Sequence, residues 1–114
     1  ALGKIDVDIA GAQELITAKV VRNSFLALKV SFFNQVYDYC KAHNIDYNSV
    51  ADVVGDDSRI TKSHTQITEE RGFGGHCFPK DVTAFITSAK QKGVELSILD
   101  TVTNYNSKIR KGTN

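Results

Sequence analysis

Tryptophan and methionine are absent from this 114-residue sequence, and it contains only one proline and two cysteines. So few cysteines exclude a disulfide-dense scaffold, and nothing else in the sequence indicates an oxidising compartment. We interpret Cys40 and Cys77 as free thiols, although the sequence leaves a disulfide between them open. Because His43, His64 and His76 do not stand at zinc-ligand spacing around either thiol, no metal site is expected.

Long apolar runs and an excess of one charge are also lacking. No run approaches the ~20 residues needed to cross a bilayer, and no charged and then apolar leader opens the chain. Fourteen basic and thirteen acidic residues give a formal net charge of +1, so charge gives no reason to expect a nucleic-acid or membrane partner. We therefore expect a cytoplasmic protein.

Nucleotide-binding motifs are missing as well. The segment GFGGHC differs from the GxGxxG pattern because Cys77 occupies the last glycine position, and no strand is evident before it. A GxxxxGK[ST] phosphate-binding loop is also absent. We expect no nucleotide-binding fold in this chain.

A long helix is predicted from Gln13 to about Asn44, because this stretch lacks glycine and proline and places apolar residues at steps of three and four. About 30 helical residues span roughly 45 Å, more than the width expected of so small a domain. The apolar residues also surround most of the helix, especially in FLALKVSFF, so the helix needs cover on every side. We predict a partner surface along it, most simply the same helix of a second chain in a two-fold homodimer.

Shorter helices are predicted in the rest of the chain. One begins with Asp46 or Asn48 as its N-cap and ends at Gly55, and residues 61–71 form an exposed loop. The other two run from Pro79 to near Gly93 and from about Leu96 to Lys111. Residues 1–12 are a lead-in, for which a short strand and a frayed segment are equally compatible with the pattern. The expectation is one all-α domain over residues 13–114.

The segment from Arg71 to Asp81, RGFGGHCFPKD, stands between two of these helices. Its glycines and Pro79 predict a shaped loop that presents Cys77, followed by a helix whose first turn holds Asp81. A position near a helix N-terminus, beside His76, favours the thiolate form of Cys77. An unreactive loop cysteine is the alternative.

Four further side chains are candidates for polar roles. Lys19 and Asn23 stand one helical turn apart, where an ammonium and an amide can stabilise an oxyanion, although the local sequence by itself favours a lysine that extends to water. Asp81 is compatible with helix capping or with proton transfer. Arg59 is compatible with phosphate or carboxylate binding, or with a surface ion pair.

Three blocks in order, AKVVRNSFLALKVSFFNQV, VADVVGDDSRI and GFGGHCFPKDVTAF, make residues 13 to 100 resemble the central domain of the UDP-glucose/GDP-mannose dehydrogenase family. The resemblance implies NAD-dependent oxidation of a nucleotide sugar's primary alcohol to a carboxylate. It implies that Cys77 is the nucleophile, forming a thiohemiacetal and then a thioester that water cleaves. Lys19 and Asn23 then stabilise oxyanions, and Asp81 organises water and proton transfer.

The resemblance also assigns Phe73, Gly74 and Gly75 to the loop against which the sugar lies, and Arg59 to a turn near the substrate. Family members carry an NAD-binding domain before this region and a sugar-nucleotide-binding domain after it. Neither is present in this sequence, so the isolated chain is not expected to be active. A catalytically silent helical dimerisation module is the alternative function.

Overall fold

The computed structural model describes residues 9–75 and 77–110. Within these residues the chain is all-α and contains no strand, which confirms the predicted fold class. The helices are α1 (Ile9–Ala42), α2 (Tyr47–Gly55), α3 (Cys77–Gln91) and α4 (Ser97–Ile109).

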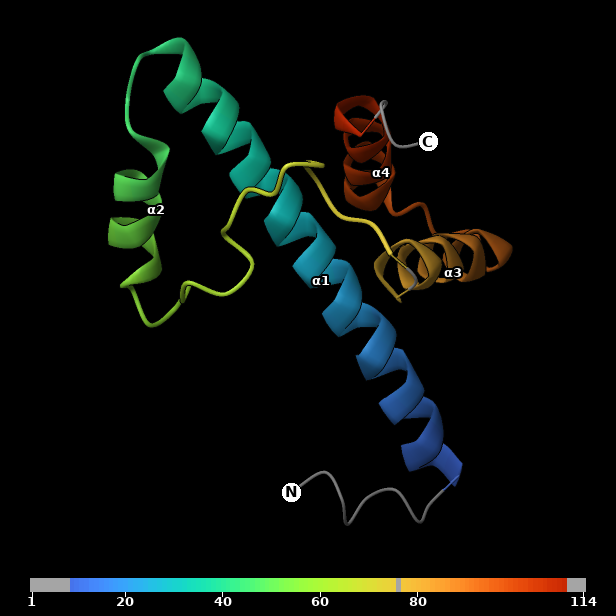
Figure 1. Cartoon of the computed structure of the whole chain (residues 1–114). Helices are drawn as coiled ribbons and strands as arrows, with labels where there is room; N and C mark the ends of the chain where they lie inside the picture. Colours follow the sequence, from blue (N-terminus) through green and yellow to red (C-terminus); the bar gives the residue numbers. More distant parts are fainter. Residues whose placement is uncertain (1–8, 76, 111–114) are drawn as a thin grey trace.

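Helix α1 is the axis of the molecule. Its 34 residues span about 51 Å at 1.5 Å per residue, close to the longest extent of the structure, 52 Å. Figure 1 shows α2 on one side of α1 and α3 and α4 on the other. The helix begins at Ile9 rather than at Gln13, and residues 1–8 of the predicted lead-in lie outside the described residues.

Helix α2 begins where its cap predicts. The Asp46 side chain accepts a hydrogen bond from the Ser49 amide at 3.1 Å, and the helix ends at Gly55. The following loop crosses α1 toward α3 (Figure 1). Lys29 of α1 fixes this crossing by donating from Nζ to the carbonyl oxygen of Ile60 at 2.6 Å.

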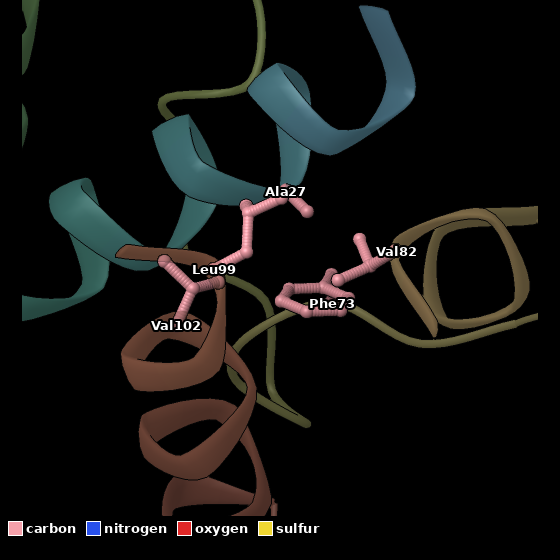
Figure 2. Packing of buried hydrophobic residues seen from close by; sticks show 5 residues of the cluster. All are labelled: Ala27, Phe73, Val82, Leu99 and Val102. Atoms are coloured by element: carbon pink, nitrogen blue, oxygen red, sulfur yellow. The ribbon is translucent and has the colours of Figure 1, made fainter. Parts of the chain in front are cut away.

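Two hydrophobic clusters lie along α1. The α2-side cluster is Phe33, Cys40, Tyr47 and Ala51. The loop-side cluster joins α1, the glycine-rich loop, α3 and α4, and consists of Ala27, Phe73, Val82, Leu99 and Val102. Figure 2 shows the Phe73 ring lying between Val82 of α3 and Leu99 of α4. This packing places the glycine-rich loop against the middle of α1.

Candidate active site

A hydrogen bond between α1 and α3 forms the centre of the candidate site. Asn23 donates from Nδ2 to Asp81 Oδ2 at 2.6 Å, although 58 positions separate the two residues in the sequence. Asp81 is only 7% exposed. A buried carboxylate needs such a donor, since an unpaired one loses its hydration without compensation.

Helix α3 begins at Cys77, two residues before Pro79, so the prediction that Cys77 stands in a loop and Asp81 in the first helical turn is wrong. Proline is accepted in a first turn because its missing N–H would have no intrahelical acceptor there. Asp81 consequently follows Cys77 by one full turn on the same face of α3. His76 and the side chain of Cys77 lie outside the described part of the structure.

Lys19 precedes Asn23 by one turn of α1, and its side chain is exposed. The two residues share a face of the helix, and Asn23 is half-buried against α3. The structure therefore brings Asn23 and Asp81 together and leaves Lys19 at the solvent edge of the same face.

The glycine-rich loop presents its residues unequally. Phe73 is buried in the loop-side cluster, whereas Gly75 is exposed, with a φ of +84° and, apart from its chain neighbours, no atom of the described residues within 4 Å of the place where a Cβ would stand. Gly74 packs against the guanidinium of Arg110, since a Cβ there would lie 2.4 Å from Nη2. Phe73 and Gly74 also line a hollow of about 290 Å³ between the loop, α3 and α4.

Arg59 stands apart from these residues, in the turn after α2. Its guanidinium donates to both carboxylate oxygens of Asp57, from Nε at 2.9 Å and from Nη2 at 2.6 Å. These hydrogen bonds lower the pKa of Asp57 and raise that of Arg59. Arg59 lines a groove with Phe32 and Phe33, a different surface from the one that holds Gly74.

Sequence reasoning did not identify Asn34, Asn106 or Arg110, whose side chains bind the backbone of the glycine-rich loop. One signal was available for Asn34, a short polar residue in the middle of an apolar helix. Asn106 and Arg110 lie in a polar stretch that gives no such contrast.

Residues 9–75 and 77–110 hold no group of three or more His, Cys, Asp or Glu side chains that could bind a metal ion. Across the same residues, every helix is too short or too polar to span a membrane.

The chain is a helical domain in which the amide–carboxylate pair of Asn23 and Asp81 lies one turn of α3 from a cysteine. Its other features are the long helix, the aspartate-containing turn after α2 and the glycine-rich loop that leads into α3. The family model described as "UDP-glucose/GDP-mannose dehydrogenase family, central domain" matches residues 13–108. The chain belongs to this family.

Curated relatives of this chain are named UDP-glucose 6-dehydrogenases. The chain is 41% identical over 92 residues to UDP-glucose 6-dehydrogenase TuaD of Bacillus subtilis, covering 81% of this chain and 20% of that protein. It is 38% identical over 100 residues to the UDP-glucose 6-dehydrogenase of Pseudomonas aeruginosa, covering 88% and 22%. For UDP-glucose 6-dehydrogenase AglM of Haloferax volcanii the identity is 35% over 96 residues, covering 84% and 22%. The chain thus spans about a fifth of the length of these relatives.

Proposed function

We propose that this chain is the central catalytic and dimerising part of an NAD-dependent nucleotide-sugar 6-dehydrogenase that acts on UDP-glucose or a close relative. The observation that carries the proposal is the Asn23–Asp81 hydrogen bond, because it joins two of the proposed catalytic residues one helical turn from Cys77. Relatives named UDP-glucose 6-dehydrogenase support the substrate class.

In this proposal the Cys77 thiolate adds to the aldehyde carbon formed from the sugar's primary alcohol, giving a thiohemiacetal. Its oxidation leaves a thioester, and water then attacks the thioester carbon, releasing the carboxylate and the free thiol. Covalent attachment keeps the aldehyde in place between the two oxidations. NAD⁺, which we assign to a nucleotide-binding domain outside this chain, would supply the oxidising power by accepting one hydride in each oxidation.

The remaining polar groups have complementary tasks. One Nδ2 proton of Asn23 is donated to Asp81, which leaves the second proton for an oxyanion on the substrate. Lys19 sits at the exposed edge of this face, where its ammonium can reach the same oxygen from the substrate side. Asp81 has a second carboxylate oxygen with which to orient the attacking water and accept its proton.

Substrate contacts are proposed for the loop and for the turn after α2. Gly75 leaves open space beside its backbone, which lets a sugar approach closely, and Phe73 and Gly74 form the base of that loop. Arg59 carries a guanidinium at the surface that can exchange the Asp57 carboxylate for a phosphate oxygen pair of the nucleotide.

A homodimer through α1 is the proposed assembly. Phe25 and Phe32 of α1 are 58% and 57% exposed, and apolar grooves flank Phe32 on both sides, one shared with α4 and one with the turn after α2. An aromatic ridge between two grooves suits a second copy of the same helix. Sedimentation should show a dimer that Phe32→Asp dissociates and that Val53→Asp, on the exposed face of α2, leaves intact. A wild-type chain that sediments as a 12.5 kDa monomer would contradict this assembly.

The catalytic proposal is tested by replacing the matching segment of the Bacillus subtilis relative with this chain. We expect the chimera to reduce NAD⁺ in the presence of UDP-glucose, and Cys77→Ala to abolish carboxylate formation. Asn23→Ala should lower kcat by about 10²- to 10³-fold, as loss of one oxyanion donor does. Cys40→Ala, at the buried cysteine of the α2-side cluster, is the matched control and should retain activity.

A folded chimera that oxidises no nucleotide sugar, or one in which Cys77→Ala still yields carboxylate, would refute the catalytic proposal. The first outcome together with an intact dimer would favour the silent dimerisation module.

A further inference from the structure

Three side chains hold the backbone of residues 71–73 by hydrogen bonds to four of its polar groups. Asn34 lies on α1, Asn106 lies on α4, and Arg110 is the C-cap of α4. Asn34 Oδ1 accepts from the Gly72 amide at 3.1 Å, and Arg110 Nη1 donates to the Arg71 carbonyl at 2.9 Å. Asn106 binds both polar groups of Phe73, accepting from its amide at 2.7 Å and donating to its carbonyl at 2.9 Å. Side chains therefore bind four backbone groups of residues 71–73, while the Arg71 amide donates to the Thr68 carbonyl at 3.1 Å.

Asn34 is buried to an unusual degree for a polar residue, with 1% of its surface exposed. Its Oδ1 also accepts from Arg71 Nε at 2.7 Å, while its Nδ2 donates to the Val30 carbonyl one turn earlier at 2.9 Å. Both acceptor positions of the amide oxygen thus face the loop. A buried amide with these partners specifies one loop geometry, because any other leaves polar groups unpaired.

The loop glycines fit this arrangement. A Cβ on Gly72, whose φ is +63°, would stand 2.1 Å from Asn106 Oδ1. A Cβ on Gly74 would stand 2.4 Å from the Arg110 guanidinium. Side chains of the chain itself therefore occupy the space beside these two glycines, and among the loop glycines only Gly75 faces space left open by the described residues.

Cys77 lies between two fixed points. Residues 74–76 separate it from Phe73, whose backbone Asn106 binds, and one turn of α3 separates it from Asp81, which Asn23 binds. Two of the three intervening residues are glycines, which by themselves allow many backbone conformations. The anchors at Phe73 and Asp81 therefore restrict where the chain can enter α3, a restriction that the glycines alone do not supply.

We propose that Asn34 and Asn106 are positioning residues for the nucleophile: together with Arg110 they hold residues 71–73 so that Cys77 starts α3 in a single, reactive placement. The inference rests on the proposed function of Cys77, since it concerns how that thiol is presented. It assigns a role in the reaction to α4, which holds none of the proposed catalytic residues.

The test measures alkylation of Cys77 by iodoacetamide as a function of pH, in a Cys40→Ala background where Cys77 is the sole thiol. Wild-type, Asn106→Ala and the matched control Asn104→Ala are compared with the same chain unfolded in urea. Asn104 lies on the same helix and is exposed. Because thiolate fraction sets the rate, we expect Asn106→Ala to move the pH profile toward that of the unfolded chain and to change the rate at pH 7 by about three- to tenfold.

Asn104→Ala should match wild-type. Circular dichroism establishes whether each variant is folded. If Asn106→Ala is unfolded, Arg110→Gln replaces it; of the four hydrogen bonds to the loop backbone, this change removes only the one to the Arg71 carbonyl. A fold defect alone would alter thermal stability and leave the pH profile of a folded chain unmoved.

Four results are distinguishable. A folded wild-type thiol more reactive than the unfolded one, with reactivity lost in Asn106→Ala, supports both proposals. Retained reactivity in a folded Asn106→Ala variant overturns the positioning role and leaves the proposed function standing. A wild-type thiol that is no more reactive than the thiol of the unfolded chain argues against the proposed function. In that case a changed alkylation rate in Asn106→Ala still supports the positioning role. An unchanged rate overturns both the proposed function and the positioning role.

Discussion

The two sides of α1 are held by different means. On the α2 side, Phe33, Cys40, Tyr47 and Ala51 pack as a hydrophobic cluster, and Lys29 fixes the following turn through a carbonyl. On the loop side a cluster of similar size is joined by a set of side-chain hydrogen bonds to loop backbone. Every proposed catalytic residue lies on α1 or on the loop side.

Apolar burial and hydrogen bonding restrict the geometry of the two sides to different degrees. Apolar burial is non-directional and tolerates repacking, so it stabilises the α2 side without requiring one exact placement. A hydrogen bond weakens steeply with angle and length, so the loop side is restricted to one geometry. The comparison suggests that the α2 side supports the fold, whereas the loop side supports the fold and the site together.

The largest expected effect comes from deleting the aromatic ring at the centre of each cluster. Phe73→Ala and Phe33→Ala should each lower the free energy of unfolding by about 3–5 kcal/mol, because both rings are buried. Urea unfolding monitored by circular dichroism measures the loss.

The milder changes Phe73→Leu and Phe33→Leu separate the two sides while keeping the chain folded. Only Phe73→Leu should alter the alkylation rate of Cys77, since Phe73 connects the anchored loop to α3. Equal effects of the two leucine variants on the thiol would remove the distinction between the sides.

A smaller effect is expected from adding one methyl group to the anchored loop. Gly72 and Gly93 both have positive φ, +63° and +78°, but only Gly72 faces another atom at short range, Asn106 Oδ1. Gly93→Ala should cost about 1 kcal/mol for its backbone conformation alone. Gly72→Ala should cost about 2–4 kcal/mol, because it must also displace the Asn106 side chain.

Unfolding of both glycine variants in urea gives the comparison directly. On the α2 side, Gly55→Ala serves as the counterpart: its Cβ would lie 2.6 Å from Lys62 Cγ and 3.1 Å from the Lys62 backbone Cα, so the backbone of Lys62 must shift. We expect Gly55→Ala to cost about 1–3 kcal/mol, as overpacking of a buried position does. A similar cost for Gly72→Ala and Gly93→Ala would show that the contact with Asn106 does not constrain the loop.

The sequence predicted the helices well, because their signals are local. Steps of three and four residues between apolar positions identified α1, and Asp46 identified the start of α2. The start of α3 was predicted too late, because proline was taken to mark the helix start, although it is also tolerated inside the first turn. Local patterns therefore give the elements, with errors of a few residues at their ends.

The loop-side contacts could not be predicted in the same way. The hydrogen bonds of Asn34 and Asn106 to the loop join positions 38 and 33 residues apart, and no pattern in a single sequence records which distant backbone group an amide will bind. The sequence marks Asn23 and Asp81 as separate candidates, and the resemblance adds their catalytic roles, but neither indicates that they touch. Their direct contact emerged only from the packing of α3 on α1.

The smallest expected effect concerns one tyrosine on each side. Burial raises the pKa of Tyr47 to about 12, with a further contribution from Cys40, and burial together with Asp38 raises that of Tyr105 to about 12. An unfolded tyrosine loses its proton near pH 10, so between about pH 10 and 12 the unfolded chain is deprotonated while the folded chain is not. This stabilises the unfolded state, and the free energy of unfolding should fall as pH rises through that range.

Tyr47→Phe and Tyr105→Phe should each reduce this alkaline loss, which urea unfolding at pH 8 and pH 11 measures. At pH 8 they should differ, because the Tyr47 hydroxyl donates to the carbonyl of the buried Thr65, whereas Asp38 keeps a 3.0 Å ion pair with Arg71 when Tyr105 is changed. We expect Tyr47→Phe to cost about 1–2 kcal/mol and Tyr105→Phe less than about 1 kcal/mol. If Tyr105→Phe is instead the costlier change, the loop side depends on its Asp38–Arg71 contacts for stability as strongly as the α2 side depends on burial. The division between the two sides would then fail.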